Sequence, residues 1–220
     1  MKVEHYDNLF HATVPVEPID HTPNDMISHD EIILLLNLCK GRGRVLEIGT
    51  WRGITTNNIL NVAGHVVSID VTEPPMTLTG GQGVGECLPK DQIGARISDE
   101  NRLRCDLRQY NPNEANGLKN LLSSIGGEYD MIIIDGDHSN EGVLIDYNET
   151  LPYLSVDGII LFHDCWWDVK PEPVIGPLTL LTRLGGFVLN RTHYGIIKNH
   201  GKRINAEEEN PSVEIHEQTI

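Results

Sequence analysis

Two stretches of the sequence place acids and histidines directly after apolar runs. DMIIIDGDH, residues 130–138, passes through four apolar residues into Asp135, Asp137 and His138. GIILF, residues 158–162, is followed in the same way by His163 and Asp164. Carboxylates that lie close together repel unless a proton or a cation lies between them, and imidazole can move protons near neutral pH. The two stretches therefore predict an acid–base centre, a metal centre, or both.

A divalent ion with oxygen ligands is the usual cation between two such carboxylates. We expect Asp135 and Asp164 to be two ligands of a Mg²⁺ site. The third ligand is open: His163 is the candidate by position and Asp137 by ligand type. Imidazole suits Mn²⁺, Fe²⁺ or Zn²⁺ better than Mg²⁺, so the identity of the metal is open as well. The alternative is that these carboxylates cap helices and hold no ion.

A glycine turn lies earlier in the chain, in RVLEIGTWRGITT at residues 44–56. An apolar strand, Gly49 and Gly53, and a helix over 54–62 would place backbone N–H groups at a helix N-terminus facing a ligand. The spacing is E-x-G-x-x-x-G and not the G-x-G-x-x-G of dinucleotide binders. Because Glu47 would repel a phosphate but can hold an ammonium group, the pattern favours a cationic or hydroxyl-bearing ligand.

The remaining pattern alternates strands with helices, which predicts an α/β fold. The strand HVVSID, residues 65–70, ends in Asp70, and a capping box of Ser28 and Glu31 opens a buried helix ending near residue 39. We expect a strand over 101–107 with Asp106 at its end. Further strands are expected over 131–134, 158–162, 186–190 and 194–198, and helices over 112–125, 139–151 and 178–184. Asp157 and Gly158 are expected to form a turn before the fifth strand.

EIGTWRG resembles the first motif of the class I S-adenosylmethionine (SAM) methyltransferases, and the strand ending in Asp70 resembles the second. The resemblance implies a Rossmann-like doubly wound sheet of seven mostly parallel strands whose last strand is antiparallel. It also implies SAM as cofactor, with the methionine part at the glycine turn, the ribose at Asp70 and the adenine amino group at Asp106. The implied cofactor-binding residues are Glu47, Gly49, Thr50, Gly53, Asp70, Asp106 and Asp135.

The D-G-D-H and H-D stretches resemble a narrower group, methyltransferase family 24, beside the metal-dependent macrolide-sugar O-methyltransferases and the cephalosporin-hydroxylase-like proteins. There, an Asp after the fourth strand and an acidic pair after the fifth bind Mg²⁺, and a His three residues beyond the first Asp is the general base. The resemblance covers residues 28–198. It implies Asp135 and His138 as catalytic residues and Asp164 as a metal ligand, while His163 stands where an acid would be.

These resemblances imply a SAM-dependent methyltransferase acting on a hydroxyl of a small molecule such as a sugar or polyketide, with the help of a divalent metal. A hydroxylase-like relative and a non-catalytic SAM-binding protein are the alternatives. Trp166 and Trp167 are candidates for the wall of the acceptor pocket or for the core. The insertion at 71–96 is interpreted as a flap over the site or as a surface insertion.

The amino-acid composition limits which partners and which cellular compartment are expected for the protein. The formal charge of −15, from 32 acids against 17 bases, argues against nucleic-acid binding. No apolar run is long enough to span a bilayer, and residues 1–10 do not resemble a signal peptide. The four cysteines form no C-x-x-C pair, which favours a reducing, cytoplasmic compartment.

The two ends of the chain are expected to lie outside the folded domain. We expect an N-terminal arm over 1–27, a domain over 28–200 and an acidic tail over 201–220. The arm is rich in His, Pro and Asp with few periodic apolar residues. We therefore expect it to pack on the surface or on a neighbouring subunit, making the protein a homo-oligomer and most simply a dimer.

Overall fold

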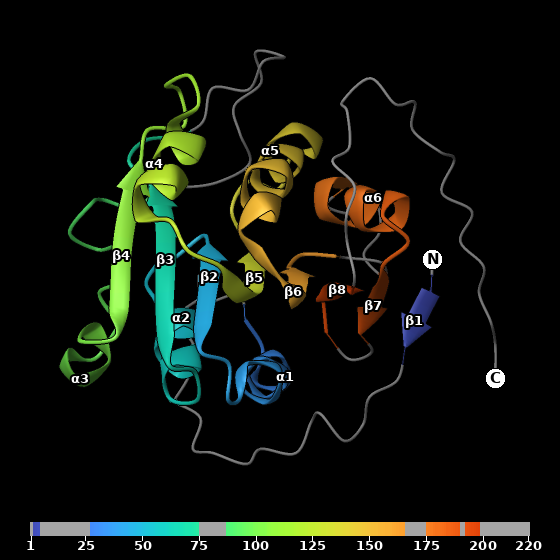
Figure 1. Ribbon diagram of the computed structural model, residues 1–220, viewed down its shortest axis with the longest axis horizontal. Coiled ribbons are helices and arrows are strands. Elements are labelled where there is room, and N and C mark those ends of the chain that lie inside the picture. The colour runs from blue at the N-terminus through green and yellow to red at the C-terminus, as the bar shows by residue number, and fades with distance from the viewer. Residues whose placement is uncertain (1, 5–26, 75–86, 166–174, 190–191, 199–220) are drawn as a thin grey trace.

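The computed structural model describes residues 2–4, 27–74, 87–165, 175–189 and 192–198, and in this part of the chain eight strands form one sheet (Figure 1). Their order is β1-β7-β8-β6-β5-β2-β3-β4, and β8 runs antiparallel to both β6 and β7. The strands are β1 Lys2–Glu4, β2 Arg44–Ile48, β3 His65–Val71, β4 Cys105–Tyr110, β5 Tyr129–Ile134, β6 Leu154–Phe162, β7 Phe187–Leu189 and β8 Gly195–Lys198. Strands β2 to β8 confirm the predicted doubly wound sheet of seven strands.

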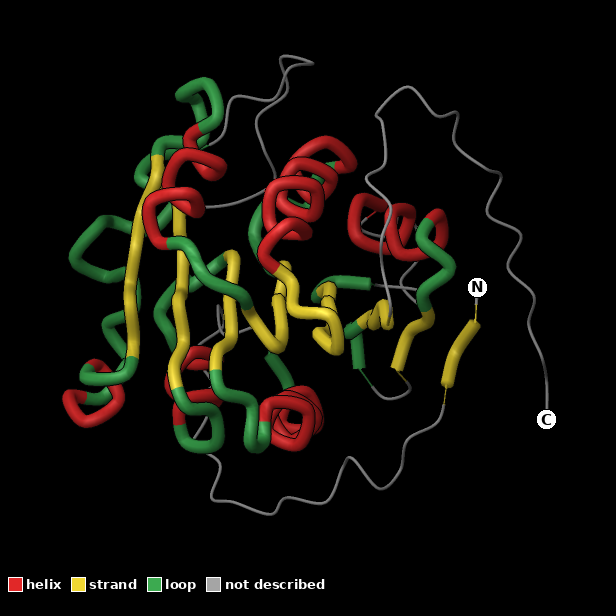
Figure 2. The backbone as a smooth tube through the Cα atoms, viewed as in Figure 1, coloured by secondary structure: helices red, strands yellow, loops and turns green. Residues whose placement is uncertain are grey.

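Helices cover both faces of this sheet, as the two outer layers of Figure 2 show. Helices α1 and α2 pack on one face, and α4, α5 and α6 pack on the other. The helices are α1 His29–Cys39, α2 Ile54–Leu60, α3 Asp99–Arg102, α4 Gly117–Ile125, α5 Asn140–Thr150 and α6 Ile175–Arg183, with a 3₁₀ turn over Leu151–Tyr153. The predicted capping box is present, since Ser28 and Glu31 exchange hydrogen bonds at the start of α1.

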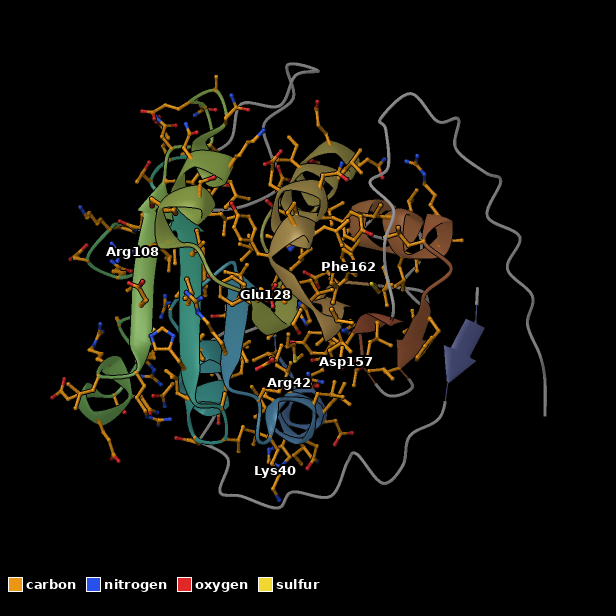
Figure 3. The ribbon with its side chains drawn as sticks, viewed as in Figure 1. Lys40, Arg42, Arg108, Glu128, Asp157 and Phe162 are labelled. Atoms are coloured by element: carbon orange, nitrogen blue, oxygen red, sulfur yellow. The ribbon has the colours of Figure 1, made fainter. Side chains whose placement is uncertain are left out.

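The central strands are apolar because both of their faces are covered. Along β6, Phe162 points toward α5 and α6 (Figure 3), where it packs near Tyr147, while Leu161 faces the α1 side. Strands β5 and β6 are in register up to Ile134 and Phe162. The next residue of each strand therefore returns to the α1 face, so Asp135 and His163 leave the sheet side by side on that face.

The strand predicted over 101–107 is wrong in its bounds, because residues 99–102 form helix α3. Ser98 caps this helix through the N–H of Asn101, and the Asn101 side chain bonds to Asn57 of α2. These polar contacts favour a helical turn over an extended strand. Strand β4 begins only at Cys105, so Asp106 lies near its start and not at its end.

Two further expectations about the strands need correction. Asp157 and Gly158 lie inside β6 and do not form a turn before it. They fall in an irregular segment where the register with β5 shifts, since Tyr129 pairs with Leu154 and Met131 with Ile159. Strand β1 was not predicted: Lys2–Glu4 add to the sheet edge beside β7 in parallel register.

Several predicted features lie outside the described residues. These are most of the N-terminal arm, Trp166 and Trp167, the centre of the 71–96 insertion and the acidic tail. The oligomer expected from the arm therefore stays a prediction. Among the described helices, none is both long and apolar enough to cross a membrane.

Candidate active site

The glycine turn between β2 and α2 is shaped by close contact with the end of β5. Gly49 has φ +97°, and a Cβ there would lie 2.1 Å from the carbonyl oxygen of Asp135. Only glycine allows this approach. Trp51 adopts φ 49°, an uncommon conformation for a residue with a side chain, and its N–H donates to Asp70 Oδ2 at 2.7 Å. The turn therefore brings the ends of β2, β3 and β5 together.

Residues 94–97 lie against the same turn. The N–H of Gly94 donates to the carbonyl of Trp51, and that of Arg96 to the carbonyl of Arg52, both at 2.8 Å. A Cβ on Gly53, which has φ +83°, would lie 2.7 Å from Ile97 Cγ1. The end of the 71–96 insertion is thus packed against the predicted cofactor turn.

Glu47 lies under the turn and is almost completely buried, with 1% exposure. Its Oε2 accepts hydrogen bonds from Thr56 and Ser68, each at 2.5 Å, and the Ser68 hydroxyl lies 2.7 Å from that of Thr50. Burial raises the pKa of Glu47 to about 8, against the effect of the two hydroxyls. Through these hydrogen bonds Glu47 connects α2 and β3 to the glycine turn. Its predicted contact with an ammonium group stays a prediction.

Asp70 lies at the carboxyl end of β3, where parallel sheets gather their ligands. Its two oxygens accept the N–H groups of Trp51 and Val71, each at 2.7 Å, and burial raises its pKa against these bonds. The neighbouring residue in register is Gln109, whose buried Nε2 has no hydrogen-bond partner among the described residues. Sequence reasoning missed Gln109, because a single amide at a strand end carries no motif.

Asp106 does not lie beside Asp70 at the carboxyl ends of the strands. It is in register with Val67, and Val67 packs in the core on the α4 side of the sheet. Since side chains alternate along a strand, Asp70 lies on the opposite face from Asp106. Asp106 is instead paired with Arg108 at 2.6 Å. The expected adenine contact is not supported by this placement.

The acid–base residues predicted at the ends of β5 and β6 do come together. One donor atom each of Asp135, His138 and Asp164 lies within 4.8 Å of the other two. His138 Nε2 is 2.9 Å from Asp164 Oδ2 and 3.9 Å from Asp135 Oδ1. Burial acts to lower the pKa of His138, but the two carboxylates outweigh it and raise the pKa to about 10.

Asp164 is held in an uncommon backbone conformation, with φ 53°. Burial acts to raise the pKa of its carboxyl, but the imidazoles of His138 and His163 outweigh this and hold the pKa well below its usual range. The loop that carries His138 is fixed by α6, since a Cβ on Gly176 would lie 2.3 Å from the His138 carbonyl oxygen. Strained backbone at a polar strand end is typical of a functional site.

His163 is enclosed by carboxylates. Its Nδ1 lies 3.0 Å from Asp135 Oδ1 and 3.5 Å from Asp164 Oδ2, and its Nε2 lies 3.5 Å from Glu31 Oε1. Its ring packs on Tyr194, with 4.6 Å between the ring centroids. Sequence reasoning assigned Glu31 only to the capping box and missed this contact, because the docking of α1 on the strand ends leaves no local signal.

Two more acidic residues, Asp137 and Asp146, lie near the start of α5 and within it. Asp137 accepts the N–H of Ser139 at 2.8 Å and caps the turn before α5, so the structure does not place it among the three clustered donors. Asp146 of α5 is 3% exposed and accepts the Asp137 N–H. Burial raises the pKa of Asp146 to about 8. Its helical spacing with Val143, Tyr147 and Thr150 was the available signal of a buried acid.

The clustered donors are close enough for one ion, but they do not fit Mg²⁺ well. Mg²⁺ prefers an octahedron of oxygens, and the cluster offers two carboxylates and one imidazole nitrogen. His163 Nδ1 already lies at hydrogen-bond distance from Asp135 Oδ1. His163, which the sequence suggested as third ligand, is not one of the three grouped donors. His163 Nδ1 nevertheless lies 3.0 Å from Asp135 Oδ1 and 3.5 Å from Asp164 Oδ2, so a metal site built by Asp135, Asp164 and His163 stays a prediction.

Comparison with known proteins agrees with this geometry. A family model described as a methyltransferase domain matches residues 46–165, more than half of the chain. The matched region runs from β2 to the residue after Asp164 and so contains the glycine turn and both polar strand ends. The chain belongs to this methyltransferase family, and its sheet is that of the class I SAM-dependent enzymes.

Solved structures share the fold at low sequence identity. An O-methyltransferase from Bacillus cereus in complex with SAH is 18% identical with a TM-score of 0.53, covering 80% of this chain and 82% of that one. TomG, an O-methyltransferase from Streptomyces achromogenes in complex with SAM, is 14% identical with a TM-score of 0.52 and the same coverage. The SAH-bound methyltransferase PaMTH1 from Podospora anserina is 17% identical with a TM-score of 0.53, covering 82% and 83%.

Sequence comparison also finds a relative of this chain. The uncharacterized protein R132 of Acanthamoeba polyphaga mimivirus is 26% identical over 134 residues. The match covers 60% of this chain and 55% of that protein, so the chain spans about half the length of the curated relative it matches.

Proposed function

We propose that this protein is a SAM-dependent O-methyltransferase that transfers a methyl group to a hydroxyl of a small molecule. The observation that carries the proposal is the convergence of Asp135, His138 and Asp164 at the carboxyl ends of two central strands. The glycine turn and Asp70 lie at the same edge of the sheet, since β2 pairs with β5 on one side and with β3 on the other. Membership of the methyltransferase family and a fold shared with named O-methyltransferases support it.

Bound SAM supplies an electrophilic methyl group on a sulfonium. The chain must bind SAM, align the acceptor oxygen and remove the hydroxyl proton. The turn over 49–53 and Asp70 are the proposed cofactor-binding residues. The cluster of carboxylates is compatible with a cationic cofactor, because an opposite charge nearby relieves their repulsion.

His138 is the proposed general base. Its Nε2 faces Asp164, so the tautomer with a proton on Nε2 is favoured and Nδ1 is the basic nitrogen. Asp164 then orients the ring and stabilises the imidazolium that forms when the ring takes the acceptor proton. With a pKa of about 10 in the cofactor-free protein, His138 is mostly protonated near neutral pH. A bound cation would lower this pKa and favour the basic form.

The class of acceptor is proposed as a hydroxylated small molecule, such as a sugar or polyketide. The formal net charge of −15 makes a nucleic acid an unsuitable partner. The four free cysteines suit a reducing, cytoplasmic compartment, which stays a prediction. A hydroxylase-like activity and SAM binding without catalysis are the outcomes that the test must separate.

The test has two stages. Calorimetric titration with SAM and with its demethylated product measures cofactor binding, and a protein that binds neither would overturn the proposal. Labelled SAM is then incubated with a panel of hydroxylated metabolites, with His138→Gln as the inactive comparison. Methyl transfer by the wild type alone supports the proposal. SAM binding without transfer to any acceptor is the outcome expected of a hydroxylase-like relative or of a non-catalytic SAM-binding protein, and it would overturn the proposed methyl transfer.

A further inference from the structure

Residues 87–98, at the end of the 71–96 insertion and just beyond it, run from the carboxyl end of β3 past the glycine turn to α2. At the first end, the Cys87 thiol lies 3.7 Å from the carbonyl oxygen of Val71, the last residue of β3. At the other end, the N–H of Ser98 donates to the side-chain oxygen of Asn57 in α2 at 3.0 Å. The 87–98 segment is therefore attached to two of the elements that hold the predicted cofactor residues.

The middle of the 87–98 segment is packed against the glycine turn. Ile93 and Ile97 are each 4% exposed, so buried side chains hold the segment in addition to its two backbone hydrogen bonds to the turn. A Cβ on Gly53 would lie 2.7 Å from Ile97 Cγ1 and 2.9 Å from Gly94 Cα. Because no space is left between them, the segment and the turn cannot move independently.

The same segment also reaches β4, on the face of the sheet that carries Asp70. A Cβ on Gly94 would lie 2.9 Å from Leu107 Cδ2. Leu107 and Gln109 are two positions apart in β4, so their side chains share one face, and Gln109 is in register with Asp70. The buried Nε2 of Gln109 has no hydrogen-bond partner among the described residues. Such a donor is costly to leave unpaired, and the ring nitrogens of a nucleobase are acceptors that suit it.

The acid–base residues of the site lie on the other side of β2. Asp135 and His138 follow β5 and Asp164 follows β6, whereas the 87–98 segment contacts the glycine turn, β3 and β4. In the sheet, β2 lies between β5 and β3. The methyl group of bound SAM has to lie beside the acid–base residues, so the segment lies beside a part of the cofactor that does not react. With Asp70 as the proposed ribose contact, that part is the nucleoside.

We propose that residues 87–98 form one wall of the nucleoside site and set how fast SAM and its demethylated product leave the protein. This inference rests on the proposed SAM binding and goes beyond it by giving the segment a role in cofactor retention. Gly94 and Ile97 are positioning residues, because they act through the glycine turn. Cys87 lies at the end of the wall nearest to Asp70, since its thiol contacts the residue that follows Asp70.

The first test uses Cys87 as a reporter of the bound nucleoside and needs no turnover. Cys39 and Cys165 are buried, and Cys87 and Cys105 are partly exposed. Burial raises the pKa of the Cys87 thiol, so the full-length protein is alkylated with N-ethylmaleimide at pH 8.5 and the peptides are quantified by mass spectrometry. Saturating SAM should slow the alkylation of Cys87 by at least ~10-fold. Cys105, at the start of β4, should react at the same rate with and without SAM.

The second test measures how fast labelled SAM dissociates from the full-length protein. Ile97→Ala removes the side chain that contacts Gly53 and should speed dissociation by at least ~10-fold. Ile97→Val keeps Cγ1 and should restore a rate close to that of the wild type. Leu122→Ala in α4 is the matched control, because it removes a buried side chain on the other face of the sheet. Urea unfolding should show a loss of stability in both alanine variants, but only Ile97→Ala should release SAM faster.

The outcomes separate this inference from the proposed function. SAM binding without protection of Cys87 would overturn the inference and leave the proposed function intact. Equal dissociation rates for the wild type and Ile97→Ala would also overturn it, because the segment would then not retain the cofactor. If Ile97→Ala does not fold, the alkylation of the wild type decides. A protein that binds neither SAM nor its demethylated product would overturn the proposed function and this inference together.

Discussion

Asp164 Oδ2 lies 2.9 Å from His138 Nε2, and Asp164 reaches that position through a left-handed backbone conformation with φ 53°. Asp164 is the second residue after β6, and an extended backbone there would continue along the strand direction. The turn at Asp164 instead directs its carboxylate toward the loop after β5. The pairing of base and acid therefore depends on backbone strain at one residue as well as on the two side chains.

The first prediction concerns the pH dependence of methyl transfer. The neutral form of His138 is required, and its pKa is raised to about 10, so kcat/KM should rise by about tenfold per pH unit below that pKa. Asp164→Asn removes a negative charge beside the ring, which disfavours the imidazolium and lowers its pKa. The rising limb of the profile should therefore move to lower pH. Identical profiles for wild type and variant would contradict the assignment.

Much of the site could be predicted from sequence, because apolar parallel strands share one carboxyl edge. Asp70, Asp135, His138 and Asp164 each follow or end an apolar run, so their gathering at that edge follows from the fold alone. The glycine turn could be predicted for the same reason. The reason why a glycine is required in this turn is only partly the one expected from the sequence. Gly49 is needed for the close approach of Asp135 as much as for any ligand.

The rest depends on tertiary contacts that leave no local pattern. Glu31 and His193 meet across 162 positions of sequence, and the capping box explains Glu31 fully at the local level. Asp106 was misplaced because NRLRCDL alternates well enough to resemble a strand. The contact between Asn101 and Asn57 of α2, which favours the helix there, could not be anticipated from the segment itself.

The second prediction tests His138 as the base. His138→Ala should lower kcat by roughly 10²–10⁴, the range for loss of a general base. SAM binding should not weaken, because the proposed cofactor contacts lie at the ends of β2 and β3 and the variant removes a positive charge that opposes the sulfonium. His29→Gln is the control, since His29 is exposed at the first turn of α1 and should retain wild-type turnover. Full activity of His138→Ala would rule out this role.

The third prediction concerns Asp70 and SAM affinity. Asp70→Asn keeps the shape of the side chain and one acceptor for the N–H of Trp51 or Val71, but it removes the charge. SAM binding should weaken by about 1–2 kcal/mol, the loss expected for hydrogen bonds to a charged group. Asp106→Asn should leave the affinity unchanged, because Asp106 lies on the other face of the sheet. Calorimetry on both variants decides between the two acids.

The fourth prediction compares two glycines with positive φ. Gly49→Ala and Gly41→Ala both place a side chain at φ above +70°, but only at Gly49 would the Cβ collide with backbone, 2.1 Å from the Asp135 carbonyl oxygen. At Gly41 nothing lies within 4 Å. Both variants should lose stability, and the loss at Gly49 should exceed that at Gly41 by more than ~1 kcal/mol. Urea unfolding measures the difference, and equal losses would show that the contact is unimportant.

The last prediction concerns stability against pH. Burial raises the pKa of Glu47 from 4.5 to about 8, so the folded protein holds a proton that the unfolded chain releases. Glu47 therefore contributes stability that is fully present below pH 4.5 and is lost as the pH rises through about 8. Asp146 acts in the same direction. Glu31 acts in the opposite direction, because its pKa is lowered to about 2 and its contribution is lost as the pH falls below 4.5.

Glu47→Gln should therefore flatten the decline in unfolding free energy between pH 5 and pH 8 while leaving the acid side of the curve unchanged. An amide at this position retains an acceptor for Thr56 or Ser68, so the fold should survive. Asp146→Asn is the matched comparison, because it removes another buried acid and should flatten the same range independently. Urea unfolding at each pH measures the free energy. A decline in Glu47→Gln as steep as that of the wild type would show that Glu47 is already ionised in the folded protein.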